Sequence, residues 1–583
     1  MDPIEVLVLA AGVIFVTTFG LTWATAIVAF FLRRGGLLRV DTRTVVSSAK
    51  RLPDHLADPA AAWPEPFRSQ LPGPILYWLA AVIVVALIGF GVWLVIRIRP
   101  AHQEAPDRRR RLGVDVQPRL AKAADMKSLV ARQSEPNRLV LGRWGRRDLL
   151  MTEPAMLRRG RGVRGAVAVF GPSQSGKTTG LVLSVNEWHG PAIVSSVKTD
   201  LMRNTIEARR LVGDVKVFDP IGISGMPCAT WSPLRRAKTQ DGAFAAAHLL
   251  ASGTGDEGST DKFWRQQAEQ LLAAMLWIAA NTDGYTMRHV VDWVTTLDRP
   301  SAEGTGTLSP LARLLTDHED PAIAAAAREV RGWLIGQWNA DPKTSASIYT
   351  TARGAVWPWT DSGVQRSAAS CDVTLDWLLD GNNTLYLVAP LGGEQRVGQV
   401  FSVMMQDLIA EAFERGNRHG PANPSVLVVL DEAANTALPT LPEWAATVTG
   451  VGIQLVTVWQ SKGQIDRVYG KDADNLLTNH RTKLLYPSGI SDLATLDYFE
   501  KLIGNEHIRS DLDNPRGIYG SGDRNRAHTP STAVPFLTPA ILRQMRVGDA
   551  LLIHGALPPA WIKSGIVPRR RNSPQRTSRD GRI

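Results

Sequence analysis

Residues 166–180 have the residue types and spacing of a phosphate-binding loop. A short apolar run ends at Phe170, the pattern G-x-x-x-x-G-K-T runs from Gly171 to Thr178, and a helix-compatible stretch follows. The glycines let the backbone turn its N–H groups inward, at the N-terminus of the following helix, where an anion binds. Lys177 supplies a charge for the β- and γ-phosphates, and the Thr178 hydroxyl is a ligand for Mg²⁺. The alternative, a chance match in a glycine-rich turn, is disfavoured by the flanking strand and helix. The candidate ATP-binding residues here are Gly171, Pro172, Ser173, Gln174, Ser175, Gly176, Lys177, Thr178 and Thr179.

A pair of carboxylates follows a second apolar run. Five apolar residues, 426–430, lead directly into Asp431 and Glu432. A buried strand would deliver both acids to the carboxyl edge of a sheet, where open α/β sheets bind ligands. We expect Asp431 to bind nucleotide and metal through a Mg²⁺-bound water, and Glu432 to orient and deprotonate the attacking water. A strand ending in two acids is common, but its pairing with a phosphate loop predicts a hydrolase.

Gln460 ends the next apolar run, 454–459. An amide at that position would sense the γ-phosphate and relay its loss. The alternative is a glutamine that merely caps a strand. We expect the sensing role because of the neighbouring motifs.

The strands and helices expected around these residues indicate a parallel α/β fold. Continuous apolar runs predict strands at 192–197, 215–218, 384–388, 426–430, 454–459, 483–486 and 550–554. Such runs are typical of parallel strands that are buried on both faces. Between 240 and 370 the period changes to that of helices, most clearly over Lys262–Asn281, with others at about 286–297, 321–336 and 343–356. We therefore predict a nucleotide-binding domain at 139–237 and 380–566, interrupted by an all-α domain at 238–379.

Two long apolar runs precede this domain. They cover about 6–32 and 75–96, and each is long enough to cross a bilayer as a helix of roughly 20 residues. The first is too long for a cleaved signal peptide, and no positive charge precedes it. We predict a membrane domain at 1–100 with two transmembrane helices, 33–74 outside the cytoplasm, and a polar juxtamembrane linker at 101–138. Positive charges normally mark the cytoplasmic side of a membrane helix, but both flanks of the second run are basic. We therefore orient the two helices by placing the ATPase domain in the cytoplasm, where ATP is available.

Composition narrows the classes of partner. The chain has 583 residues, a net charge of +11 and a pI of about 9.8. A basic balance suits nucleic acid or an anionic membrane surface. The two cysteines, Cys228 and Cys371, have no metal-ligand spacing and exclude a disulfide framework. The Arg-rich end, 567–583, is predicted to be a disordered basic tail.

At this point the motifs resemble the TraG/TraD/VirD-type coupling proteins of type IV secretion and conjugation, within the FtsK/HerA group of RecA-like motors. Besides the phosphate loop and the acids, the matching segments are Lys198-Thr199-Asp200, Trp231-Ser232-Pro233-Leu234, Lys262-Phe263-Trp264, 343–352, Gln460-Ser461 with Gln464, Asn479, 536–539 and 548–550. Ser196 stands where the family usually has an aspartate.

The resemblance implies a RecA-like NTPase fold and a homo-hexamer whose ATP sites lie between subunits. It implies a multi-pass protein of the inner (cytoplasmic) membrane, with the ATPase domain in the cytoplasm. The expected cofactors are ATP and Mg²⁺. The expected partners are DNA, more often single-stranded, a relaxase or other secreted protein, and the channel proteins of the secretion system. The all-α domain would help to select the substrate.

One family feature is absent. Many relatives carry an arginine just before the strand that ends in the motif glutamine, where it reaches a neighbour's ATP. Here that stretch, 448–453, has none, so Arg481 is the replacement candidate and Arg467 the next. An arginine finger contributes several orders of magnitude in rate in other NTPases, so its absence would predict slow basal hydrolysis.

Three other functions fit parts of the sequence. A double-stranded DNA translocase of FtsK or TraB type usually lacks the helical insert and carries a winged-helix tail, for which the C-terminal tail is too short. A receptor for secreted proteins without any role for DNA would keep all the motifs. A membrane scaffold with an inactive ATPase is disfavoured by the intact Lys177, Asp431 and Glu432.

Overall fold

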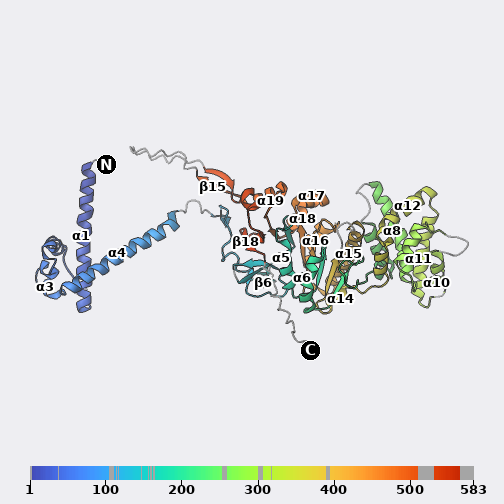
Figure 1. Ribbon diagram of the computed structural model, residues 1–583, viewed down its shortest axis with the longest axis horizontal. Helices are drawn as coiled ribbons and strands as arrows, with labels where there is room; N and C mark the ends of the chain where they lie inside the picture. The colour runs from blue at the N-terminus through green and yellow to red at the C-terminus, as the bar shows by residue number, and fades with distance from the viewer. Residues whose placement is uncertain are drawn as a thin grey trace, which may run out of the picture. The chain divides into compact units, whose positions relative to one another are not determined.

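The computed structural model divides the chain into two compact units, residues 1–117 and 118–583 (Figure 1). It describes residues 3–36, 38–103, 110–112, 114–115, 117–145, 147–154, 156–157, 160–161, 165–252, 259–299, 306–316, 318–388, 394–436, 438–509 and 531–564. The predicted basic tail, 567–583, lies outside these residues.

The first unit pairs two long helices, α1 (Pro3–Arg34) and α4 (Pro74–Gln103). Among the described residues, Pro74–Gly91 is the one stretch that is long and apolar enough to cross a membrane, with a mean hydropathy of 2.3. Thus the predicted span at 75–96 lies on a helix that meets this test. The predicted span at 6–32 also lies on a helix, but as a second membrane crossing it is not confirmed.

The segment between these helices folds as a small cap. Its elements are α2 (Thr42–Arg51), η1 (Leu52–His55), η2 (Pro59–Ala62) and α3 (Phe67–Gln70). Trp63 is buried and its indole N–H donates to the hydroxyl of Tyr77 on α4, at 3.3 Å. The Arg33 guanidinium donates to the carbonyl of Leu71, which ties both ends of the cap together.

A 12-stranded mixed sheet forms the centre of the second unit. Its parallel part runs in the order β10 (Val215–Phe218), β11 (Thr384–Val388), β9 (Ala192–Ser196), β12 (Val426–Leu430), β13 (Ile453–Trp459), β8 (Val167–Phe170) and β14 (Thr482–Leu485). The antiparallel part continues with β17 (Asp549–His554), β18 (Ala560–Lys563), β4 (Val140–Trp144), β5 (Asp148–Met151) and β3 (Val130–Ala131). The central parallel strands β9, β12 and β13 are buried on both faces, as their largely apolar sequences predicted.

Helices cover both faces of the sheet. On one face, α5 (Lys177–Asn186) and α6 (Thr199–Arg210) share a core with Val167, Val194 and Leu427. The core of the other face includes α15 (Glu394–His419), α16 (Leu441–Thr447), α17 (Lys462–Tyr469), α18 (Ala473–Asn479), α19 (Leu493–Ile503) and α20 (Pro539–Arg543). Short 3-10 turns, η5 (Val448–Val451) and η6 (Gly470–Asp472), connect some of these helices.

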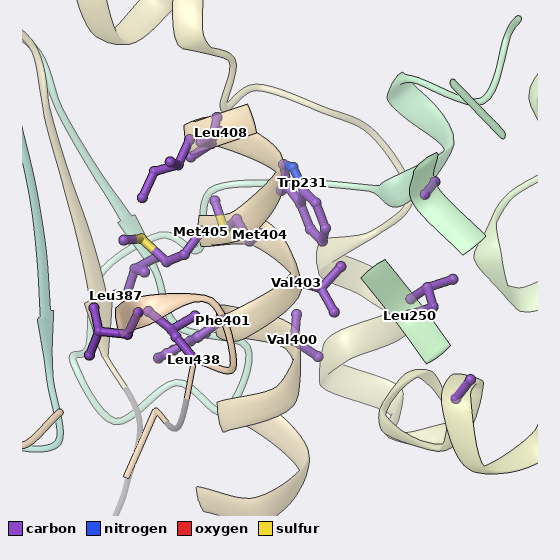
Figure 2. Packing of buried hydrophobic residues seen from close by; sticks show 14 of the residues in the cluster. Trp231, Leu250, Leu387, Val400, Phe401, Val403, Met404, Met405, Leu408 and Leu438 are labelled. Atoms are coloured by element: carbon purple, nitrogen blue, oxygen red, sulfur yellow. The ribbon is translucent and has the colours of Figure 1, made fainter. Parts of the chain in front are cut away.

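The described residues between β10 and β11 form helices. They are η3 (Pro233–Arg235), α7 (Gln240–Ala251), α8 (Ser259–Ala280), α9 (Met287–Thr295), α10 (Leu308–Thr316), α11 (Pro321–Trp338), α12 (Pro342–Val356), η4 (Trp357–Thr360), α13 (Ser362–Ser367) and α14 (Leu375–Leu379). In Figure 1, α8, α10, α11 and α12 lie together at one end of the second unit. Figure 2 shows α15 between the sheet and α7: Phe401 and Met405 of α15 lie toward Leu387 of β11, whereas Val400 and Val403 point toward Leu250 of α7.

One stretch differs from the expected linker. Residues 118–138, which were predicted to be part of it, belong to the second unit and contribute β3 and the buried side chains of Met126 and Leu129. Three two-stranded pairings complete the structure: β1 (Arg110–Arg111) with β2 (Val114–Asp115), β6 (Met156–Leu157) with β7 (Gly160–Arg161), and β15 (Asn505–Arg509) with β16 (Ser531–Pro535).

Candidate functional site

The phosphate loop joins β8 to α5 and is held against two neighbouring segments. The Gly171 N–H donates to the carbonyl of Trp459 on β13, at 3.1 Å, and the Gly548 N–H donates to the carbonyl of Ser175, also at 3.1 Å. Gly176 has a φ of 101°, and a Cβ atom there would lie 2.9 Å from the Cα of Gly548. Only glycine fits a left-handed position in such close contact with another backbone. The loop shape therefore depends on the glycine that the motif places before Lys177.

Lys177 lies inside the loop. Its ammonium donates to the carbonyl of Gly171 and, at 2.8 Å, to that of Pro172. Burial lowers the pKa of Lys177, while the charges of Asp431 and Glu432 act in the opposite direction. The Ser175 hydroxyl is buried and has no hydrogen-bond partner among the described residues. A cation and an unpaired donor beside a helix N-terminus fit the phosphates of a nucleotide.

The remaining loop residues face solvent to different degrees. Ser173, Gln174 and Thr178 are exposed, whereas Pro172 and Thr179 are half-buried. Thr178 follows the lysine in the first turn of α5. Thr178 is thus accessible to a metal ion from solvent.

The two acids follow β12 directly. The Ser196 hydroxyl donates to the Asp431 carboxylate, at 2.9 Å, and the Asp431 N–H donates to the carbonyl of Ser195 on β9. Burial raises the pKa of Asp431, and the charge of Glu432 adds to this shift. Glu432 has a φ of 62°, which is uncommon for a residue with a side chain, and its carboxylate accepts from the Asn435 amide at 3.0 Å.

The sheet order brings the acids and the loop to one edge. β13 lies between β12 and β8, and all three strands are parallel, so Asp431 and Phe170 end at the same carboxyl edge. Both acids interact electrostatically with Lys177, as does the side chain of Lys198, which follows β9. The structure therefore brings together Lys177, Thr178, Asp431 and Glu432, which are far apart in the sequence.

Gln460 follows β13 at the same edge, between the acids and the loop. Its backbone N–H donates to the side-chain oxygen of Gln464, at 2.9 Å, and the Ser461 hydroxyl accepts from the Gln464 N–H at 3.4 Å. Ser461 is the N-cap of α17. The Gln-Ser-x-x-Gln part of the motif therefore builds a fixed turn that holds Gln460 beside the loop.

Arg481 is not brought to this group. It precedes β14, whose residue Leu485 pairs with Phe170, so Arg481 lies at the opposite edge of the sheet from the phosphate loop. Its guanidinium donates to the Glu153 carboxylate at 3.1 Å, and its side chain packs against Gly165 and Gly555. These contacts explain Arg481 as part of a local ion pair. Arg467 is exposed on α17.

Three contributors to the site were not predicted from the sequence. Ser196 was noticed only as a departure from a motif, but it hydrogen-bonds Asp431. Asn435 could have been identified from the sequence, because it lies three residues after Glu432, a spacing at which two side chains can meet across a turn. Gly548 contacts the loop from a distant segment, which no local pattern reveals.

The chain is similar to known proteins in sequence and in fold. Residues 121–565 match the family described as type IV secretory system conjugative DNA transfer. A conjugal transfer protein TraG of Agrobacterium fabrum is 25% identical over 410 residues, 69% of this chain and 60% of its own length. A probable conjugal transfer protein TraG of Sinorhizobium fredii is 21% identical over 413 residues, 69% of this chain and 62% of its own length. The chain thus spans about three fifths of these curated relatives.

Solved structures show the same fold. The bacterial conjugative coupling protein TrwBdeltaN70, in its unbound monoclinic form, superposes with a TM-score of 0.54 at 15% identity, covering 77% of this chain and 93% of that one. The plasmid coupling protein TrwB in complex with ADP and Mg²⁺ superposes with a TM-score of 0.52 at 16% identity, covering 77% and 94%.

Proposed function

The chain belongs to the type IV secretory system conjugative DNA transfer family, as a TraG/TraD-type coupling protein, and from this premise we propose that it is an ATPase that drives DNA into a secretion channel. The observation that carries the proposal is the meeting of Lys177 with Asp431 and Glu432 at one sheet edge. A phosphate-binding cation beside two acids is the arrangement that hydrolysis of a phosphoanhydride requires.

Each residue of the site has a distinct role in this proposal. The loop from Gly171 to Thr179 binds the phosphates, with Lys177 on the β- and γ-phosphates. Thr178 and Asp431 would hold Mg²⁺, which neutralises phosphate charge when it is bound. Glu432 orients the attacking water and accepts its proton.

Gln460 has a relay role. It leads into α17 through the turn capped by Ser461, so a shift of its side chain would move that helix. We assign the arginine that completes a neighbouring site to Arg467 instead of Arg481. Arg467 is exposed on the helix that Gln460 would move, whereas Arg481 is bound to Glu153. This assignment requires a ring, which we propose to be a homo-hexamer.

The membrane anchor and the cargo complete the proposal. Helix α4 carries the candidate span, and we propose that α1 is the second, with the cap on the far side of the inner membrane and the ATPase in the cytoplasm. Residues 139–237 and 380–566 form the motor, and 238–379 form a helical region that selects the cargo. We propose a relaxase-bound single strand as the cargo, which suits the net charge of +11.

Binding of DNA by the full-length protein in detergent tests the cargo. We expect a single-stranded oligonucleotide to bind, with an affinity that falls steeply as salt rises because phosphate contacts release counterions. Tighter binding of the duplex would favour a double-stranded DNA translocase. Failure to bind either form at moderate salt would contradict a DNA cargo and favour a receptor for secreted proteins.

A further inference from the structure

A cavity of about 470 Å³ lies over β17 and β18 and is lined by none of the site residues described above. Its volume falls in the range of about 300–1,000 Å³ that is typical of small-molecule pockets. Leu120, Leu537, Met545 and Leu551 give it an apolar lining, and Trp561 forms part of its wall. An apolar pocket with an aromatic wall suits the flat face of a heterocyclic base.

The cavity is joined to the loop through backbone contacts. The Gly548 N–H donates to the carbonyl of Ser175, and the Ser564 N–H donates to the carbonyl of Gly548 at 2.7 Å. Asp549 follows Gly548, Lys563 precedes Ser564, and both of these charged side chains line the cavity. Its polar end therefore lies at the carboxyl edge of the parallel strands, one residue along the chain from the backbone that touches the loop, and on the sheet face opposite α5.

Strand register places Trp561 deeper in the same cavity. In the β17–β18 pair, Asp549 is opposite Lys563 and Leu551 is opposite Trp561. Alternate residues of a strand point to the same face, so these four side chains share one surface. Trp561 is two residues from the charged pair, about 7 Å along the strand. Its side chain is 54% exposed, which is unusual for so large an apolar group and leaves a ring face accessible.

The sheet order fixes the direction in which a nucleotide would leave the loop. Asp431 and Glu432 lie on the β12 side of β8, so the terminal phosphate must point that way. The α-phosphate and the nucleoside therefore leave toward the other side, where β14, β17 and β18 follow in order. The cavity lies over β17 and β18 on that side.

We propose that this cavity is the nucleoside subsite of the ATP site, with the base stacked on Trp561 and the sugar near Asp549 and Lys563. The proposal rests on the proposed ATPase function, which it deepens by naming the residues that recognise the non-reacting part of the nucleotide. Base stacking on an aromatic side chain contributes about 1–3 kcal/mol in nucleic-acid complexes, equivalent to at least about fivefold in affinity.

Titration calorimetry of the full-length protein with Mg²⁺ tests the subsite, using ATP and inorganic triphosphate as separate ligands. The wild type should bind ATP more tightly than triphosphate. Trp561→Ala should weaken ATP binding about tenfold and leave triphosphate binding unchanged, since only ATP carries a base. Trp561→Phe should keep most of the ATP affinity, because it retains a ring.

The matched control is Trp357→Ala, at an indole that is 49% exposed and lies in η4, away from the loop. It should bind both ligands like the wild type. If Trp561→Ala also binds both ligands like the wild type, while Lys177→Ala loses both, the base lies elsewhere and the subsite is refuted. If the wild type binds neither ligand, or Lys177→Ala binds both normally, the proposed ATPase function itself fails.

Discussion

The hydroxyl of Ser196 donates a hydrogen bond to the carboxylate of Asp431, with 2.9 Å between the two oxygens. The two residues end neighbouring parallel strands, β9 and β12, although 235 positions separate them in the chain. Burial raises the pKa of Asp431, and the bond from Ser196 opposes this by stabilising the ionised form. A hydroxyl at the place of the family's usual aspartate therefore avoids a third negative charge beside Asp431 and Glu432.

Replacing Ser196 should weaken the metal site. In Ser196→Ala the Asp431 carboxylate loses a donor that stabilises its ionised form, so its pKa rises further. A hydrogen bond to a charged group contributes roughly 1.5–3 kcal/mol, so we expect Mg²⁺ affinity in the presence of ATP to fall about tenfold or more. The pH at half-maximal hydrolysis should move upward, which a pH series of steady-state rates would measure.

The control for this variant is Ser195→Ala on the same strand. The Asp431 N–H donates to the backbone carbonyl of Ser195, so removing that side chain leaves the bond intact. Equal loss of Mg²⁺ affinity in both variants would mean that Ser195 and Ser196 act only through packing, and that the hydrogen bond to Asp431 has no role.

Asn435 should matter for catalysis through Glu432. Its amide holds the Glu432 carboxylate at 3.0 Å, on a residue whose φ is 62°. Asn435→Ala should lower kcat by about tenfold, less than the loss on removing a general base, which is about 10²–10⁴-fold. The KM for ATP should stay unchanged, because Asn435 is not part of the phosphate loop. A kcat equal to that of the wild type would show that Glu432 needs no such support.

Replacing Arg481 should lower stability, whereas replacing Arg467 should lower the rate of ATP hydrolysis. Arg481→Ala leaves the nearly buried Glu153 carboxylate without its 3.1 Å partner, so we expect a loss of roughly 1–3 kcal/mol in stability and a lower Tm. Its ATPase rate per folded molecule should match the wild type. Arg467→Ala should do the reverse, with an unchanged Tm and a hydrolysis rate reduced by about 10³-fold or more if it completes a neighbouring site. If Arg467→Ala hydrolyses ATP at the normal rate and Arg481→Ala loses hydrolysis, Arg481 is the arginine that completes the neighbouring site.

His480 should make stability fall in weak acid. Its ring is fully buried between the Thr457 hydroxyl, at 2.9 Å, and the carbonyl of Leu476, at 2.7 Å, and burial lowers its pKa to about 4. The unfolded chain binds this proton at the ordinary pKa of about 6.5, so stability is complete above pH 6.5 and is lost as pH falls toward 4. The loss is at most roughly 3–4 kcal/mol, because the two pKa values differ by about 2.5 units and one unit corresponds to about 1.4 kcal/mol.

Thermal unfolding of the wild type and His480→Asn across this pH range checks the assignment. Other groups titrate in both proteins, so the difference between the two curves is the informative quantity. It should shrink as pH falls from 6.5 to 4, because only the wild type pays for a buried charge. A difference that is constant with pH would refute the assignment.

The sequence predicted the parallel part of the sheet well. Strands such as Thr384–Val388 and Val426–Leu430 were predicted with the bounds that the structure has, because burial on both faces demands a nearly unbroken apolar run. The loop and the acids were also identified, since their local spacing carries their chemistry. The antiparallel extension was harder. The run at 550–554 was predicted as one of the parallel strands, but β17 pairs antiparallel with β14 and β18, which a local apolar run cannot reveal. β3 has two residues and β18 alternates buried and exposed positions, so neither gives a long apolar run.

Contacts between distant segments were not predictable in this way. The contact of Gly548 with Ser175, and that of Ser196 with Asp431, depend on which strands become neighbours. The same holds for Arg481, whose sequence position after Asn479 and His480 gave no sign that it lies at the opposite edge of the sheet. Similarly, the cap between α1 and α4 depends on the burial of Trp63 against Tyr77, which no periodic pattern marks.

The central claim is that Lys177, Asp431 and Glu432 form one site that hydrolyses ATP. The most direct test is the rate of phosphate release by the full-length protein, compared with Lys177→Ala and Glu432→Gln. We predict ATP- and Mg²⁺-dependent hydrolysis that Lys177→Ala abolishes, and that Glu432→Gln reduces by about 10²–10⁴-fold while ATP still binds. Hydrolysis that continues at the wild-type rate in both variants would contradict the account.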